Sequence, residues 1–129
     1  MPIEVVWDNA EQTVLRFDYS TPWTWEDLRH AVQTASDMSR DMQRVVSVIN
    51  DVSHASALPD GALVTFRGIA RVTPDNTGLI VVAGGGMLVD AMISMFRRLS
   101  GSQAANWRTA KSLDEARAMV QVWRQETQP

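Results

Sequence analysis

The sequence contains no cysteine and only two histidines among its 129 residues. The absence of cysteine excludes disulfide bonds, thiolate-bound zinc, iron–sulfur clusters and thiol nucleophiles. The two histidines, His30 and His54, lie far apart in the sequence and leave little from which to build a histidine-based metal site. We therefore expect no metal site and no cofactor.

An excess of positive charge and long apolar runs are also missing. Twelve lysines and arginines against fifteen acidic residues give a net charge of −3, so no global basic field attracts nucleic acid. No run of 18 apolar residues is present, which predicts no membrane span. The opening residues show no basic segment followed by an apolar stretch, so we expect no signal peptide and a cytoplasmic location. The length favours one domain over residues 1–129.

Apolar and polar side chains alternate in two segments near the start of the chain, residues 3–7 and 15–19. This period of two predicts two strands, and the polar residues 8–11 between them predict a hairpin turn. The triplet 20–22, Ser-Thr-Pro, is typical of a helix start. Apolar residues then recur at helical spacing over residues 23–39, which predicts an amphipathic helix packed on a sheet.

The rest of the chain alternates between apolar strands and helices. The expected strands cover residues 45–49, 78–83 and 106–109, and the expected helices cover 61–71, 87–99 and a segment that begins at Ser112. Ser112 followed by Glu115 three residues later is the pattern of a capping box. Strands that alternate with helices need crossover connections. We therefore expect an α/β fold with a mixed, mostly parallel sheet of four to five strands and about four helices.

This order of elements and several short motifs resemble the STAS domain, nearest to the SpoIIAA-like group of small bacterial proteins related to anti-sigma-factor antagonists. The segment from Val45 to Ser53 is similar to the family strand that ends in Asp-Leu-Ser. Residues 58–62, Leu-Pro-Asp-Gly-Ala, look like the family loop Asp-Ser-Ser-Gly-Leu, and residues 112–116 look like its closing helix start. The resemblance implies a STAS/SpoIIAA-like fold and a non-enzymatic regulatory function.

The loop that carries regulation in that family differs here. In anti-sigma-factor antagonists a kinase phosphorylates the first serine of Asp-Ser-Ser-Gly. When Gly61 is placed on the family glycine, Pro59 stands at that serine and Asp60 at the second. Proline has no hydroxyl, so we expect the usual phosphoacceptor to be missing.

The same loop is the first candidate binding site, because it follows a central strand at the edge where open α/β sheets bind ligands. Aspartate and serine at such a place also satisfy turn amides or cap the next helix, so a purely structural role stays open. No strained Gly-x-Ser-x-Gly elbow is present, and we expect no catalytic residue and no enzyme. The candidate residues for a partner or ligand are Asp51, Ser53, Ser56, Pro59, Asp60 and Gly61.

Three consecutive glycines, Gly84, Gly85 and Gly86, join an expected strand to an expected helix. Free backbone amides at such a junction can contact an anion. The dinucleotide and P-loop patterns are both incomplete, so a tight strand-to-helix turn is the alternative.

The helix expected over residues 87–99 has an apolar arc of roughly 200°, whereas a helix that covers one sheet face needs about 100°. Part of this arc should be exposed, unless the helix is buried more deeply than expected. Exposed apolar surface of this width predicts a homodimer, a contact with another protein, or a site for an apolar or lipid-like ligand. The candidate residues are Met87, Met92, Met95 and Phe96.

Five tryptophans are many for this length. We expect Trp7 and Trp25 in the core, and Trp23 and Trp107 half exposed at a pocket or an interface. The leading hypothesis is an interaction domain that binds a protein partner or a second copy of itself. The alternative is a carrier or binder of a small apolar or lipid-like molecule.

Overall fold

The computed structural model describes residues 2–20, 22–55, 61, 68, 73–101 and 105–127, without the side chain of Leu88. The elements in chain order are β1 (Ile3–Trp7), β2 (Val14–Tyr19), α1 (Trp25–Ser39), β3 (Val46–Asp51), β4 (Thr77–Ala83), α3 (Gly86–Ser100), β5 (Trp107–Ala110) and α4 (Leu113–Thr127). The helix expected over residues 61–71 lies outside the described residues except for Gly61 and Gly68. The α/β class is confirmed.

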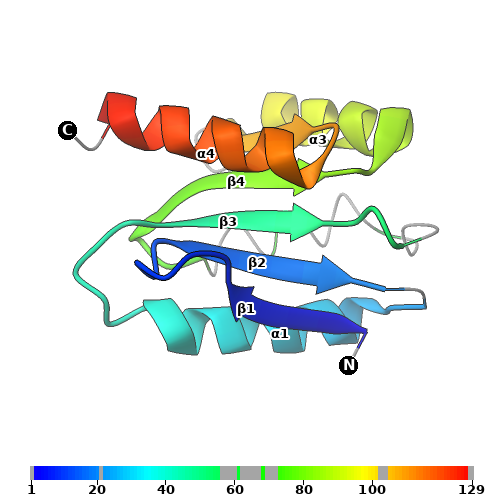
Figure 1. Cartoon of the computed structure of the whole chain (residues 1–129). Coiled ribbons are helices and arrows are strands. Elements are labelled where there is room, and N and C mark those ends of the chain that lie inside the picture. The colour runs from blue at the N-terminus through cyan, green and yellow to red at the C-terminus, as the bar shows by residue number, and fades with distance from the viewer. Residues whose placement is uncertain are drawn as a thin grey trace.

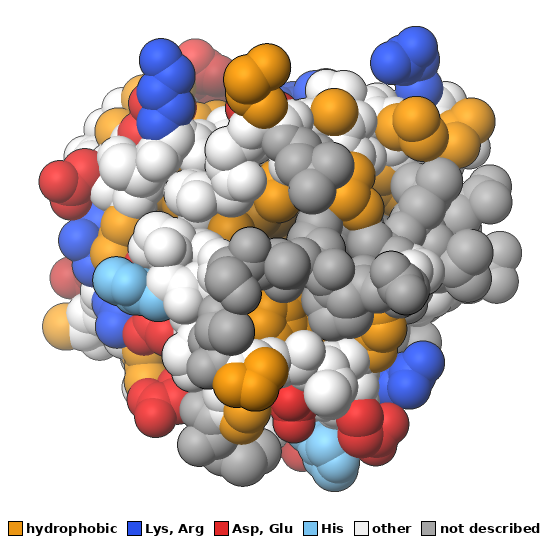
Figure 2. Space-filling model, turned by 90° about the vertical axis from the view of Figure 1, so that its right-hand side faces the viewer, with side chains coloured by type: hydrophobic (Ala, Val, Ile, Leu, Met, Phe, Trp, Pro, Cys, Tyr) orange, Lys and Arg blue, Asp and Glu red, His pale blue; other side chains and the backbone are white. Residues whose placement is uncertain are grey.

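The five strands form one sheet in sequential order, β1-β2-β3-β4-β5. β1 pairs antiparallel with β2, and every later pair is parallel, so the sheet is mixed and mostly parallel as expected. β2 through β5 therefore end at the same edge of the sheet, on the right in Figure 1. This edge, which faces the viewer in Figure 2, is where open parallel sheets place their binding sites.

Strand alternation divides the core into two parts, one on each face of the sheet. The larger part joins β2, β3 and β4 to α1 and α3, with Leu15, Phe17 and Tyr19 pointing into it. The smaller part lies under α4 and contains Ile49 and Val81. Figure 1 shows α1 and α4 at opposite sides of the sheet. The face that carries α1 and α3 therefore holds most of the buried apolar volume.

The first helix begins later than its sequence pattern predicts. α1 starts at Trp25, and Thr24 is its N-cap. The Thr24 hydroxyl accepts a hydrogen bond from the backbone N–H of Asp27, and the Asp27 carboxylate accepts one from the backbone N–H of Thr24. The helix begins at this capping box rather than at residues 20–22, because the box satisfies the backbone amides of Thr24 and Asp27 at the helix start.

The cap of the last helix agrees in part with its pattern. The Ser112 hydroxyl accepts a hydrogen bond from the backbone N–H of Glu115, as expected. The Glu115 carboxylate, however, accepts from the backbone N–H of Lys111 rather than from that of Ser112. Glu115 still accepts a hydrogen bond from a backbone amide, and its negative charge lies near the positive end of the helix dipole.

The burial of the tryptophans is the reverse of the expectation. Trp23 and Trp107 are buried in the core, whereas Trp7 and Trp25 are only partly buried. Phe96 of α3 packs edge-to-face against Trp107, with 5.1 Å between ring centroids, and draws this side chain inward. Trp23 lies between the rings of Tyr19 and Trp25. Phe96 and Trp107 belong to different elements, and Trp23 belongs to no helix or strand. The period of the sequence pattern therefore could not predict the burial of either tryptophan.

A cluster of charged side chains fastens the β1–β2 hairpin to α4 on the opposite face. The Asp8 carboxylate accepts hydrogen bonds from Arg16 at 2.7 Å and from Arg117 at 3.0 and 2.8 Å. Burial alone would raise the pKa of Asp8, but the hydrogen bonds from Arg117 and Arg16 outweigh it and hold this pKa below its ordinary value. The charged form of Asp8 is therefore stabilised by folding.

We expect Asp8→Asn to lower the free energy of unfolding by about 1–2 kcal/mol at neutral pH, because it removes charge-assisted hydrogen bonds from two arginines. A pKa that folding depresses adds stability above its unfolded value, and this stability is lost as the pH falls through the folded value. The difference between the two proteins should therefore shrink below about pH 4 in urea titrations. Asp114→Asn is the control, because Asp114 also pairs with Arg117, but at 3.7 Å and with a side chain that is 96% exposed. An equal effect of both changes would contradict the role of the cluster.

Candidate functional site

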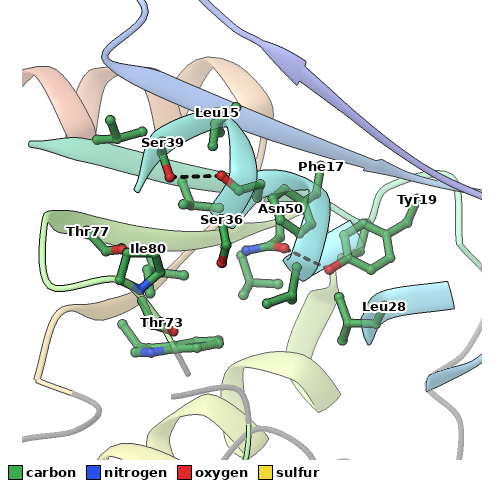
Figure 3. Close-up of a pocket in the computed structure, with 18 of the residues that line it drawn as sticks. Leu15, Phe17, Tyr19, Leu28, Ser36, Ser39, Asn50, Thr73, Thr77 and Ile80 are labelled. Atoms are coloured by element: carbon green, nitrogen blue, oxygen red, sulfur yellow. Dashed lines mark hydrogen bonds between the residues drawn. The ribbon is translucent and has the colours of Figure 1, made fainter. Parts of the chain in front are cut away.

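A cavity of about 80 Å³ lies on the sheet face that carries α1 and α3. Figure 3 shows its walls, in which side chains from β2, β3 and β4 face side chains of α1. The lining residues are Leu15, Phe17, Tyr19, Trp23, Leu28, Val32, Ala35, Ser36, Ser39, Val46, Val48, Asn50, Val52, Thr73, Pro74, Thr77, Ile80, Val82, Val89 and Trp107. These described lining residues include no aspartate, glutamate, lysine, arginine or histidine, so the wall that they form is apolar with a few neutral polar groups.

Two of the polar groups, Tyr19 and Asn50, are bonded to each other. The Tyr19 hydroxyl donates a hydrogen bond to Asn50 Oδ1 at 2.7 Å, and both side chains are buried. Burial raises the pKa of the Tyr19 phenol far above its ordinary value, so the hydroxyl keeps its proton at any physiological pH. The bond therefore holds the Asn50 amide with its oxygen toward Tyr19.

The other end of the Asn50 amide is its NH₂ group. Figure 3 shows this nitrogen on the side away from Tyr19, toward Ser36 across the cavity. Within the part of the chain that the structure describes, Asn50 Nδ2 makes no hydrogen bond. Ser36 of α1 is buried as well, and its hydroxyl makes none with the described residues. Both groups thus offer unused hydrogen-bonding capacity to the cavity.

Trp23 also lines the cavity and carries a further polar group, its indole N–H. Its side chain is 7% exposed, and its indole ring meets the Tyr19 ring edge-on at 5.1 Å between centroids. The indole Nε1 is buried and has no hydrogen-bond partner among the described residues. A buried N–H without an acceptor costs about 1–3 kcal/mol relative to a bonded one, so such groups are rare in folded proteins. An acceptor supplied from outside the chain would remove this cost.

The loop after β3 is described only in part. The Asp51 carboxylate accepts hydrogen bonds from the backbone N–H and the hydroxyl of Ser53, at 3.1 and 2.6 Å. This is a local turn of the kind that aspartate and serine form on their own. Gly61 has a positive φ of 81°, and Ser56, Pro59 and Asp60 lie outside the described residues. The structure does not bring Asp51 and Ser53 to the cavity.

The three glycines form a closely packed turn. A Cβ on Gly84 would lie 2.8 Å from Ser53 Cβ, and one on Gly85 would lie 2.5 Å from the Val89 side chain. The Gly84 N–H donates to the Ala110 carbonyl at 3.0 Å and so is not free for an anion. The close contacts with Ser53 and Val89 leave no room for a side chain at Gly84 and Gly85. Gly86 has open space around it, but its φ of 72° favours glycine.

The apolar arc of α3 is partly exposed, as expected, and two of the four candidates, Met87 and Met95, are among its exposed residues. Met87 and Met95 are 88% and 49% exposed, and Met92 is only partly buried. Phe96 is 0% exposed and packs in the core against Trp107, so the prediction that it lies at an interface is wrong. Leu99, 55% exposed, takes its place on the surface.

The polar face of α1 is solvated. His30 is exposed and lies 3.4 Å from Glu26. No group of three or more potential ligands that could hold a metal ion occurs among the described residues. In the same residues, no helix has both the length and the apolar character needed to cross a membrane.

Comparison with protein-family models and with curated proteins gave no match. The geometry of the cavity therefore carries the functional argument. The expectation that Trp23 and Trp107 lie at a pocket agrees with their place in the cavity wall, whereas the sequence patterns did not predict the roles of Tyr19 and Asn50. One signal was available: Asn50 falls in the alternation of Val46 and Val48, at a position where the strand otherwise points apolar side chains inward.

Proposed function

We propose that this protein binds a small, mostly apolar molecule in the cavity between α1 and the sheet. The observation that carries the proposal is the combination of an apolar wall with a buried N–H, Trp23 Nε1, that has no partner among the described residues. Ligand sites are typically concave, largely apolar and equipped with a few convergent polar groups. If the cavity were only a packing defect, the unbonded indole N–H beside it would destabilise the fold with no benefit.

The size of the cavity limits its occupant. An engineered apolar cavity of about 150 Å³ binds benzene, and the volume here is about 80 Å³. By proportion the cavity accepts about three heavy atoms, either as a whole molecule or as one end of a longer one. At a ceiling of about 1.5 kcal/mol per heavy atom, three buried atoms give a dissociation constant of about a millimolar, and tighter binding needs contacts of a longer molecule outside the cavity.

We also propose that, within the α/β class, the fold is STAS/SpoIIAA-like. The order of elements, with a β-hairpin followed by parallel strands alternating with helices, supports it. A regulatory role through the loop over residues 51–61 remains the proposal that the resemblance implies. The position that aligns with the family's phosphorylated serine is Pro59, which has no hydroxyl, and in the described part of the loop the Ser53 hydroxyl donates a hydrogen bond to Asp51.

Cavity filling tests the ligand site. Ala35 of α1 lines the cavity, so Ala35→Leu places three more carbons in existing space and should raise the free energy of unfolding by about 1–2 kcal/mol. The same change should abolish binding of a small apolar probe such as xenon, followed by NMR. Ala31 is equally buried on α1 but does not line the cavity. Ala31→Leu should overpack the core and cost about 1–3 kcal/mol. Destabilisation of similar size by both changes would argue against a usable cavity.

A second candidate function, self-association, is favoured by the exposed face of α3. Met87, Ala91, Met95 and Leu99 are all exposed and follow one another at intervals of four residues. Residues at this spacing form a ridge along one side of a helix, and two such ridges can pack against each other. We call these four residues the α3 ridge.

The charges beside the α3 ridge favour a second copy in antiparallel orientation. Asp90, Ser94 and Arg98 flank the ridge at the same four-residue interval and are exposed. An antiparallel two-fold pair puts Asp90 of one copy beside Arg98 of the other, whereas a parallel pair would align like charges. No carboxylate among the described residues forms an ion pair with Arg98. An apolar patch of about 300–600 Å² per copy supports only a weak dimer.

We expect sedimentation velocity to show a dimer whose population rises with concentration in the micromolar range. Met95→Glu should shift this equilibrium toward monomer by about tenfold or more, because it places a charge within the apolar contact. Val122→Glu on α4 is the control, since Val122 is similarly exposed but lies on another helix. A 14.4-kDa species at every concentration of the unmodified protein would rule out self-association.

A further inference from the structure

We infer that the cavity selects a neutral molecule that presents a hydrogen-bond acceptor, such as a small ketone, over a carboxylate of the same size. This inference rests on the proposed function and names the ligand class. It draws on the bonding state of three side chains, Tyr19, Trp23 and Asn50, around one end of the cavity.

The described part of the wall offers an ion no partner of opposite charge. None of the described lining residues carries a charge at neutral pH, since Tyr19 is the one ionisable group among them and burial keeps it neutral. A bound carboxylate would lose its hydration without gaining a cationic partner, and a bound amine would lose its own without gaining a carboxylate. Neutral molecules escape this penalty.

The direction of the Asn50 amide decides between acceptor and donor ligands. Tyr19 donates to Asn50 Oδ1, which leaves the two N–H bonds of Nδ2 for the cavity. An amide held in this way meets a ligand as a donor. Tyr19 is thus a positioning residue: it acts on the ligand through the orientation that it imposes on Asn50.

Trp23 reinforces this preference because the indole N–H can only donate. Both Trp23 and Asn50 contact Tyr19, one by ring packing and the other by a hydrogen bond. Two donors without a hydrogen-bond partner among the described residues therefore adjoin the same tyrosine. A carbonyl oxygen can accept a hydrogen bond from either of them.

The test compares three probes by ¹⁵N NMR: xenon, butanone and butanoate, at neutral pH. We expect the Trp23 indole and Asn50 side-chain signals to shift with butanone and to saturate. The dissociation constant for butanone should be at least about tenfold lower than that for butanoate. Equal or tighter binding of butanoate overturns the inference. Xenon separates the two proposals: failure of both xenon and butanone to bind overturns the proposed function itself, whereas xenon binding without a preference for butanone overturns only the ligand class.

Variants assign the preference to individual side chains. Trp23→Phe keeps an aromatic ring but removes the N–H, so it should weaken butanone binding by about fivefold and leave xenon binding unchanged. Trp25→Phe is the matched control, because Trp25 packs on Trp23 without lining the cavity, and it should change neither. Tyr19→Phe removes the hydrogen bond that fixes the Asn50 amide, so the amide can turn its oxygen toward the cavity. This oxygen accepts a hydrogen bond from 2-butanol but not from butanone. The preference for butanone over 2-butanol should therefore decrease. A parallel loss of xenon and butanone binding in Trp23→Phe would mean that Trp23 only shapes the wall, and would overturn its role as a donor.

Discussion

The hydrogen bond from Tyr19 to Asn50 is the contact on which the character of the cavity depends. It joins the neighbouring parallel strands β2 and β3 near their carboxyl ends, where Phe17 of β2 is already in register with Asn50. Without it, two polar groups would be buried unpaired in an apolar core. With it, one acceptor and one donor are satisfied, and the remaining amide N–H bonds are directed to the cavity.

Much of the fold could be predicted because it depends on local patterns. The alternation of Leu15, Phe17 and Tyr19 with Arg16 and Asp18 predicted both the strand and its buried face, and the structure confirms both. Helix ends were harder to predict, since several hydroxyl residues precede α1. The sequence alone does not say that Thr24, rather than the serine and threonine before the proline, would find an acidic partner three residues later in the right geometry.

The candidate site could not be predicted in the same way, because a cavity is defined by contacts between distant segments. Trp23 belongs to no helix or strand, so no periodicity assigns its burial. Phe96 occupies one side of an apolar arc that is wider than the core can cover. Which side turns inward is decided by its contact with Trp107, eleven positions further along the chain in another element. The exposed residues of α3 follow only from that choice.

The neutrality of the described cavity wall follows from the alternation of the strands. Each charged side chain of β2, Arg16 and Asp18, stands between two apolar ones and is turned to the α4 face, where Asp8 and Arg117 complete the ionic cluster. The opposite face of the same strands receives the uncharged residues, and its two polar exceptions, Tyr19 and Asn50, bond to each other. A single period of two thus separates an ionic surface that fastens the hairpin from a neutral interior. A charge placed by mutation at an inward position of β2 or β3 would therefore damage folding and the proposed ligand site together.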